Sequence, residues 1–414
     1  MNYKLTKYTC YYTYISMASI FGLPPLLFVT FKEMYGISYT LLGTLVLINF
    51  CTQLVIDLIF SFFTKYFNIH KTVKLMPLMT AIGMLVYAII PMLYPVHAYL
   101  GIVLGTVICS VAAGLCEVLL SPIIAALPSD TPERDMSNLH SLYAYGVVIV
   151  VLFSTAYFKI FGTHNWMWLV IVLAILPVIS SILYCVSPMP QMNLTGDNPA
   201  KSTSHKRNYG LMLCVICIFL GSAAENAMTN WISGYMEKAL HISKTIGDLL
   251  GLTLFAILLG LGRTLYGKYG KSIMPVLFIS MAGSAACYLT AGLCNIPAIA
   301  VLACILNGLF AAMLWPGILI LMEEKISSPG VAAYALMAAG GDFGGSVAPQ
   351  LLGIVVDTVA ASPTAEKLSA ALNLSTEQIG MKAGMLTTAV FPVIGFILLV
   401  FMKKYFSKSN FRNA

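Results

Sequence analysis

The sequence predicts an all-α membrane protein with twelve transmembrane helices, arranged as two pseudo-symmetric halves of six helices. An apolar composition, a series of long apolar segments and one central polar stretch predict this fold. Of the 414 residues, 59% are hydrophobic and only 9% are charged, whereas a soluble domain carries roughly 25% charged residues. Backbone amides in hydrocarbon must bond within their own segment, so we expect the spanning elements to be helices.

The apolar segments are long enough to cross a bilayer, which takes about 20 residues in a helix. The first six expected spans lie at 9–31, 39–63, 73–94, 98–125, 138–162 and 166–187. The second six lie at 209–236, 246–267, 272–293, 297–322, 329–358 and 380–402. The first segment is too long for a cleavable signal peptide, so we expect it to remain as a helix.

The central polar stretch is rich in Pro, Ser, Asn and Lys, a composition typical of a linker. An Ile-Ser-x-Thr motif enters the second span at 37–40 and recurs at the start of the eighth at 242–245, which supports two related halves. The expected organisation is an N-terminal half at 1–187, a cytoplasmic linker at 188–208, a C-terminal half at 209–403 and a tail at 404–414.

Lysine and arginine are concentrated on one side of this topology. With both termini inside, 17 of the 23 basic residues lie on the inner side and 6 on the outer side. The positive-inside rule therefore favours a multi-pass protein of a bacterial cytoplasmic (inner) membrane, with both termini cytoplasmic. The net charge of +7 follows from these juxtamembrane residues, so we expect no nucleic-acid partner.

Motifs of soluble enzymes are absent from the sequence. It has no Walker A loop, no GxSxG, no HExxH and no GxGxxG after a strand. The glycine cluster at 340–345 lies inside an apolar span, which argues against a phosphate loop. The ten cysteines lie in or beside apolar segments, as expected of buried thiols rather than a disulfide framework. We therefore expect no enzyme activity, no cofactor and no metal site.

A few ionisable residues lie deep in the expected spans, where charge is costly and usually functional. Glu117 lies in the fourth span, Glu225 in the seventh and Asp342 in the eleventh, and His140 lies near the start of the fifth. A carboxyl group in apolar surroundings can bind and release a proton. We expect these four residues to carry proton coupling; the alternative is a structural role in locking helices together.

The seventh span also carries side chains suited to a polar ligand. Asn226 follows Glu225, and Trp231 and Tyr235 are four residues apart on one helical face. Amide, carboxylate and aromatic groups together suit a polyhydroxylated solute, although Trp231 and Tyr235 could instead belong to an interfacial aromatic belt. Further candidate substrate-binding residues are Asn307, Trp315, Asn49 and Gln53.

Other residues are candidates for gating and conformational change. Proline removes a backbone donor and glycine permits close contact or local unwinding, so both mark possible breaks in a spanning helix. Charged residues nearer the span ends could form gates. The candidates are Asp57, Arg263, Pro24, Pro25, Pro122, Gly344 and Gly345.

Six spans, a basic linker and six more spans resemble the major facilitator superfamily, and several motifs resemble its fucose:proton symporter and sugar-permease branch. These motifs are Glu117 followed by Pro122, Glu225 followed by Trp231 and Tyr235, and the Trp315-Pro316 pair. The branch carries an Asn-Asp pair in its first helix, where this chain has only FGLPPLLFVTF at 21–31. By this resemblance, Glu117 and Glu225 are left to carry proton coupling.

The leading expectation is a monomeric secondary transporter that imports a small polar solute, with sugar favoured, together with H⁺ by alternating access. An exporter of drugs or amphiphiles by proton antiport is the alternative within the same class. A transporter-like membrane sensor that binds a ligand without moving it is the alternative from a different class.

Overall fold

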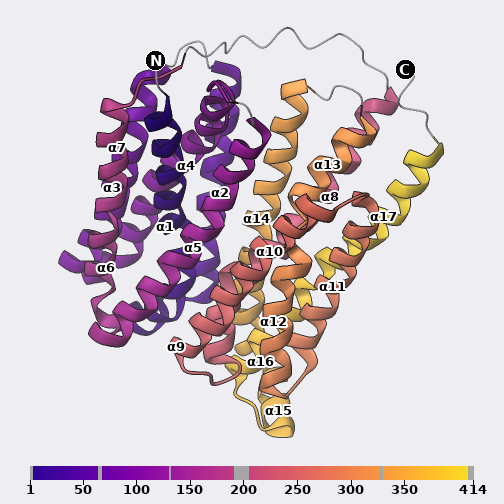
Figure 1. The fold of residues 1–414 in the computed structure, drawn as a ribbon. Helices are drawn as coiled ribbons and strands as arrows, with labels where there is room; N and C mark the ends of the chain where they lie inside the picture. Colours follow the sequence, from indigo (N-terminus) through magenta and orange to yellow (C-terminus); the bar gives the residue numbers. More distant parts are fainter. Residues whose placement is uncertain (1–2, 64–67, 130–131, 191–204, 327–329, 409–414) are drawn as a thin grey trace. The chain divides into compact units, whose positions relative to one another are not determined.

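The computed structural model describes residues 3–63, 68–129, 132–190, 205–326 and 330–408. Every regular element in these ranges is a helix (Figure 1). Among the described residues, eleven helices are long and apolar enough to cross a membrane, and a shorter apolar helix covers Tyr145–Phe161. This confirms the all-helical membrane architecture predicted from the sequence.

The helices of the first half follow the expected spans closely. They are α1 (Lys4–Tyr35), α2 (Tyr39–Phe63), α3 (Ile69–Leu93), α4 (Ala98–Ala125), α5 (Pro132–Phe161), α6 (Trp166–Leu173) and α7 (Ile175–Val186). The expected sixth span is divided between α6 and α7. Pro177 has no N–H to donate to the carbonyl four residues before it, and the helix is interrupted one residue after that carbonyl, at Ala174.

The second half contains more interruptions. Its helices are α8 (His205–Lys238), α9 (Lys244–Gly247), α10 (Leu254–Tyr269), α11 (Ile273–Leu293), α12 (Pro297–Ala311), α13 (Pro316–Lys325), α14 (Gly330–Ala360), α15 (Pro363–Leu372), α16 (Thr376–Thr388) and α17 (Val390–Lys408). A π-helical segment, η4 (Asp248–Thr253), joins α9 to α10. Pro316 separates α12 from α13, and α15 is a short helix in the 360–379 loop.

The chain divides into two compact units. The first contains Met1–Ile37 and Ile48–Gly196, and the second contains Ser38–Leu47 and Asp197–Ala414. The beginning of α2 therefore belongs with the C-terminal helices, and the rest of α2 belongs with the first unit. The 188–208 linker prediction falls largely on residues outside the described ranges.

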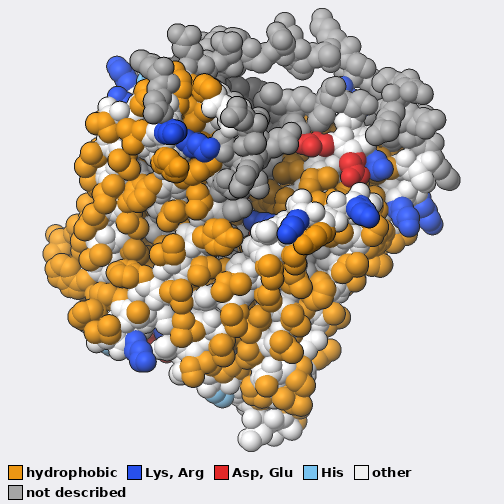
Figure 2. Space-filling view, viewed as in Figure 1, with side chains coloured by type: hydrophobic (Ala, Val, Ile, Leu, Met, Phe, Trp, Pro, Cys, Tyr) orange, Lys and Arg blue, Asp and Glu red, His pale blue; other side chains and the backbone are white. Residues whose placement is uncertain are grey.

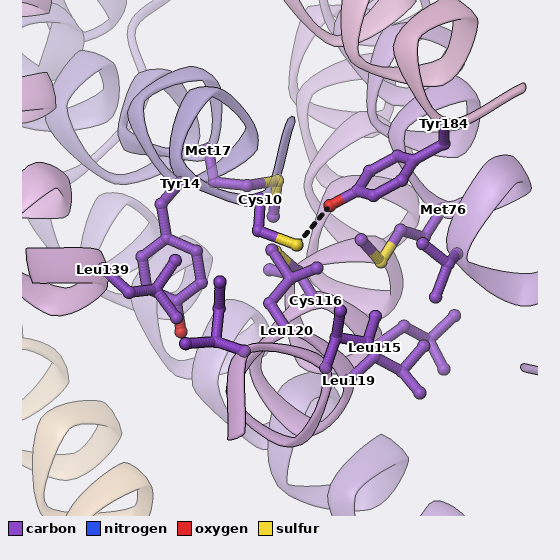
Figure 3. Close-up of a cluster of buried hydrophobic side chains, with 14 of the residues drawn as sticks. Cys10, Tyr14, Met17, Met76, Leu115, Cys116, Leu119, Leu120, Leu139 and Tyr184 are labelled. Atoms are coloured by element: carbon purple, nitrogen blue, oxygen red, sulfur yellow. Dashed lines mark hydrogen bonds between the residues drawn. The ribbon is translucent and has the colours of Figure 1, made fainter. Parts of the chain in front are cut away.

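The core of the first unit is a cluster of buried apolar side chains from α1, α3, α4, α5 and α7 (Figure 3). Within it, the Tyr184 hydroxyl donates a hydrogen bond to Cys10 Sγ at 3.6 Å. Glycines bring α3 and α4 close together: a Cβ on Gly105 would lie 2.5 Å from the Tyr87 side chain. The ten cysteines are all described, and all are free thiols.

The second unit is built around the pairing of α8 with α14. A Cβ added to Gly344 would lie 2.1 Å from the Phe219 carbonyl oxygen, and one added to Gly340 would lie 2.8 Å from the Val215 side chain. These two glycines lie four residues apart on one face of α14, so the backbones of the two helices can approach closely. The helix continues through the glycine cluster without unwinding.

Large apolar side chains remain exposed along the length of the helices, as Figure 2 shows for one face of the molecule. On α3, for example, Leu75, Leu78 and Ile82 are exposed, and on α17 Ile394, Ile397 and Phe401 are exposed. A water-facing surface rarely carries apolar area on this scale. Contact with the hydrocarbon core of a membrane accounts for this exposed apolar surface.

Candidate functional site

The centre of α8 carries an ion pair within the second unit. The Arg263 guanidinium, from α10, lies 2.9 Å from Glu225 Oε1, and its Nη2 donates a hydrogen bond to that oxygen. The Glu225 side chain is 13% exposed and that of Arg263 is 33% exposed. The second carboxylate oxygen, Oε2, is buried and has no hydrogen-bond partner among the described residues. The sequence predicted both residues as functional but did not predict that they pair.

A proline explains how Arg263 is held in place. Pro316 has no N–H to bond the carbonyl four residues earlier, which is that of Ala312. Arg263 Nε donates to this carbonyl at 3.0 Å. The interruption between α12 and α13 at Pro316 therefore supplies a fixed acceptor for the guanidinium.

A row of amide and hydroxyl groups continues along α8 beside Glu225. The Asn226 amide donates to the Ser222 hydroxyl and carbonyl, each at 3.1 Å, and the Asn230 amide donates to the Asn226 carbonyl at 2.9 Å. Asn226 is half-buried, as is Glu225. These bonds leave the Asn226 side-chain oxygen able to accept a further hydrogen bond.

Asn307 on α12 is fully buried, at 0% exposure. Neither its amide nitrogen nor its amide oxygen has a hydrogen-bond partner in the described part of the chain. Leaving a buried amide unpaired costs about 1–3 kcal/mol, so this position is not explained by packing alone. It remains a candidate polar contact.

Trp231 and Tyr235 are both fully buried inside the second unit. Trp231 Nε1 donates to the Pro349 carbonyl at 3.1 Å, and the Tyr235 hydroxyl donates to the Ala291 carbonyl at 2.5 Å. Their polar atoms are thus satisfied by the backbones of neighbouring helices. Neither ring lies on the lipid-facing surface, as an interfacial belt would require.

Two further candidates meet around α14. A Cβ on Gly341 would lie 2.3 Å from the Trp315 ring, so that glycine leaves room for the indole. Asp342, the next residue, is 4% exposed. Gly345 follows in the same continuous helix.

In the first unit, polar residues lie four apart along α2 and face α4. The Ser110 hydroxyl on α4 donates to Asn49 Oδ1 at 2.6 Å, and Gln53, which is buried, donates to the Asn49 carbonyl at 3.4 Å. The next residue in the row is Asp57, with one carboxylate oxygen buried and unpartnered within the described ranges. A Cβ on Gly114 would lie 3.3 Å from that oxygen.

Glu117 lies one helical turn beyond Gly114 on α4, and its charge interacts with that of Asp57. The side chain of Glu117 is exposed although the residues around it are mostly buried. Two neighbouring carboxylates repel each other when both are ionised, so the protonation of one depends on the other. The structure brings together two residues that the sequence assigned to separate roles.

The remaining predicted residues show no comparable cluster. Pro24 and Pro25 lie inside an uninterrupted α1. The side chains of His140 and Pro122 lie outside the described part of the structure, so neither prediction is tested.

Asp248 is a buried acid that sequence reasoning missed. It begins the π-helical segment η4, accepts a hydrogen bond from the Ser233 hydroxyl, and lies 3.6 Å from the Lys244 ammonium. Acidic residues commonly stabilise the first turns of a helix. The sequence therefore does not distinguish Asp248 from an ordinary residue of this kind. The π-helical turn, a form found at functional sites, gave no recognisable sequence signal.

Among the described residues, no group of three or more His, Cys, Asp or Glu side chains could hold a metal ion. The chemistry available is that of two sets of groups. One is the carboxyl pair of the first unit, and the other is the ion pair with its neighbouring amides in the second. Both can exchange protons and bind polar atoms.

Comparison with solved structures identifies the fold. A D-xylose–proton symporter is 15% identical, with 94% of this chain and 97% of that chain covered and a TM-score of 0.72. A bacterial homolog of the human lysosomal transporter Spinster, inward-facing and unoccupied, is 12% identical, with 99% of each chain covered and a TM-score of 0.76. A variant of the E. coli fucose:proton symporter is 13% identical, with 97% and 99% covered and a TM-score of 0.60.

At these identities the likeness concerns the fold alone. No curated protein matches the sequence. The family model described as Major Facilitator Superfamily matches residues 10–349, which is most of the chain. The chain therefore belongs to the major facilitator superfamily.

Proposed function

We propose that this transporter couples the uptake of a small polar solute to protons by alternating access, with sugar as the favoured solute class. The observation that carries the proposal is the Glu225–Arg263 pair near the middle of α8, about 20 Å from the end of that helix. An ion pair at this depth is expensive to desolvate and adds little stability, which favours a functional role.

The pair links protonation to a change in the site. When Glu225 is ionised, it neutralises the Arg263 guanidinium. When Glu225 takes up a proton, the guanidinium keeps its charge and loses its counter-ion, while the Ala312 carbonyl still holds it in place. The site then has a donor group available for an acceptor atom of a solute, so proton binding favours solute binding.

The carboxyl pair of the first unit supplies a second proton-binding group. Asp57 and Glu117 interact electrostatically, so a single proton on the pair relieves their repulsion. In this proposal Glu117, the exposed member of the pair, exchanges the proton. Net uptake then requires Glu117 to release its proton inside the cell.

A polar solute suits the groups beside the ion pair. Asn226 and Glu225 are half-buried and offer hydrogen-bond acceptors, and directional hydrogen bonds of this kind suit the hydroxyl groups of a sugar. Two of the structurally similar proteins are, by their descriptions, symporters of D-xylose and fucose with protons. These likenesses support the choice of sugars as the first compounds to test.

The test is transport by the purified protein in proteoliposomes. Counterflow against a panel of sugars, nucleosides and amino acids identifies the solute, and an internal pH dye records proton movement. We expect solute entry to be accompanied by protons and to be accelerated by an inward proton gradient. Solute movement without any proton movement would contradict the coupling, and export of amphiphiles with no uptake would favour the antiport alternative.

Glu117→Gln gives a sharper form of this test. Exchange of solute requires only the loaded carrier to move, whereas accumulation requires proton release. The variant should therefore retain counterflow and lose proton-driven accumulation. Glu366→Gln, at an exposed position on α15, is the matched control and should behave as the unmodified protein. Wild-type accumulation by Glu117→Gln across pH 5.5–8 would assign Glu117 a structural role.

A further inference from the structure

Helices α11 and α17 of the second unit lie side by side (Figure 1). The Phe278 ring of α11 meets the Phe396 ring of α17 edge-on, with the ring centroids 5.2 Å apart. A Cβ added to Gly395 of α17 would lie 2.6 Å from the Met281 sulfur of α11. Direct packing therefore fixes how these two helices sit against each other within the second unit.

The exposed side chains of α17 form a long apolar stripe. They are Val390, Val393, Ile394, Phe396, Ile397, Val400 and Phe401. At 1.5 Å per residue, the stretch from 390 to 401 is about 16 Å long, which is close to half of the roughly 30 Å hydrocarbon core of a bilayer. Ile279, next to Phe278 on α11, is exposed as well. This surface has the length and the chemistry that suit a lipid acyl chain.

Two lysines follow the stripe. Lys403 and Lys404 come directly after it on α17, and both are exposed. The Lys403 ammonium nitrogen lies 5.9 Å from the centroid of the Phe278 ring, so this side chain lies over α11. A lysine stem can cover apolar surface in this way while its charge stays at the polar boundary. We call the α17 stripe, Ile279 and these two lysines the α11–α17 face.

Tyrosines indicate that the lysines lie at the depth of lipid head groups. The Tyr209 ring, near the start of α8, meets the Tyr405 ring of α17 edge-on, with the centroids 5.2 Å apart. Tyr269, the last residue of α10, is exposed at the same end of the unit. Tyrosine is enriched where a membrane meets water. Lys404 directly precedes Tyr405, so its charge lies near the lipid phosphates and not in hydrocarbon.

The turn between α10 and α11 adds positive charge at this end. It is flanked by Lys268 and contains Lys271, and both side chains are exposed. The Lys268 ammonium nitrogen lies 5.3 Å from the centroid of the Tyr269 ring. Since α11 begins directly after this turn, at Ile273, the positive charge extends from the end of α17 to the start of α11.

The exposed acids at this end belong to a different side of α11. They are Glu323 and Glu324, on α13. A Cβ on Gly317 of α13 would lie 2.9 Å from the Ile273 side chain of α11. Phe278, which meets α17, lies about 140° further around α11. The helix that carries the two acids therefore does not cover the α11–α17 face.

We propose that the α11–α17 face binds one anionic phospholipid of the surrounding membrane, with its phosphate beside Lys403 and Lys404 and an acyl chain along the α17 stripe. A zwitterionic lipid would supply the chain without a net negative charge, and a soluble phosphate would supply the charge without the chain. In the predicted topology this end faces the cytoplasm. Basic groups between spanning helices on that side suit the head groups of anionic lipids.

The experiment measures lipid binding to the purified, delipidated protein by native mass spectrometry. Phosphatidylglycerol is the anionic probe, and phosphatidylcholine with the same acyl chains is the zwitterionic one. We expect phosphatidylglycerol to bind more tightly. Lys403→Gln should weaken its binding about fivefold, and Lys403→Gln/Lys404→Gln about 25-fold. Lys403→Arg keeps the charge and should keep the affinity, which separates loss of charge from loss of fold.

Two controls separate this site from general attraction. Lys367→Gln removes an exposed lysine on α15 and should leave phosphatidylglycerol binding unchanged. Soluble glycerol 3-phosphate should not displace the lipid, because it lacks the acyl chains. Equal binding of the two lipids would overturn the proposal, as would an equal loss in Lys367→Gln or displacement by glycerol 3-phosphate. Lipid binding is measured without any transported solute, so this result is independent of the proposed transport function.

Discussion

At the scale of single residues, a backbone carbonyl helps to hold the charged side chain of Arg263 in the second unit. Arg263 bonds to a carbonyl that Pro316 leaves free and to Glu225, so its guanidinium is fixed from two directions. A charge fixed in this way needs no movement of the surrounding helices when its partner changes protonation. The contribution of the Glu225–Arg263 pair to protein stability can be measured separately from transport.

Removing one member of the Glu225–Arg263 pair should destabilise the protein more than removing both. Arg263→Gln leaves the half-buried Glu225 without its counter-ion, at a cost of about 1–3 kcal/mol given its partial exposure. The double variant Glu225→Gln/Arg263→Gln leaves no unpaired charge. A double-mutant cycle of thermal stability in detergent should show that the two single losses sum to more than the loss in the double variant. Simple additivity would mean that the two groups do not interact.

At the scale of helices, close packing between α8 and α14 depends on glycine. The residues at 340 and 344 lie against the α8 backbone and side chains, and the helix does not unwind there. The sequence could not distinguish unwinding from close contact, because glycine permits both. The partner helix decides between them, and its position depends on contacts far apart in the chain.

Gly344→Ala should destabilise this helix pair. Its Cβ would lie 2.1 Å from the Phe219 carbonyl oxygen, and backbone cannot move aside as a flexible side chain can. Overpacking of this kind costs about 1–3 kcal/mol. The measurement is the thermal unfolding midpoint in detergent, with Gly267→Ala as the control.

Gly267 lies in α10, and a Cβ added there would have nothing within 4 Å. Alanine at this position should be neutral or stabilising by up to about 1 kcal/mol, because alanine favours helix more than glycine does. Equal effects at the two positions would contradict the packing argument.

At the scale of the whole molecule, the sequence predicts the architecture well because lipid imposes a simple rule. Each expected span corresponds to a helix or to two helices in line, since the length of the apolar segment is set by the bilayer. Pro177 and Pro316 then explain where a span divides. The grouping of 38–47 with the second unit was not predictable, because it depends on Asp357 reaching a helix start more than 300 residues away in the chain.

The candidate site was predictable in part for the same reason. Glu117, Glu225 and Arg263 could be found as charges in apolar segments. Their partners could not, because pairing across helices depends on helix rotation. Asp248 could not be predicted as a buried acid because acidic residues are common near helix starts.

The predicted topology has both termini on the cytoplasmic side. A cysteine at Ala370, which is exposed on α15, should be labelled from outside the cell in a cysteine-free background. A cysteine at Lys404, which is exposed on α17, should be labelled only after the membrane is made permeable. Labelling of both positions from the same side would contradict the arrangement.

The bond between Arg263 and the Ala312 carbonyl has a consequence for how this protein can diverge. Pro316 frees the carbonyl and Arg263 uses it, although the two side chains are 53 positions apart in the sequence. Across homologous sequences, positions 263 and 316 should therefore be inherited together, and loss of either should accompany loss of the other. Ala312 contributes through its backbone, so its own identity is restricted only by size: a Cβ on Gly262 would lie 2.6 Å from the Ala312 methyl group. Covariation of positions 263 and 316, with only small residues at 312, would show that selection has maintained this bond to a backbone carbonyl.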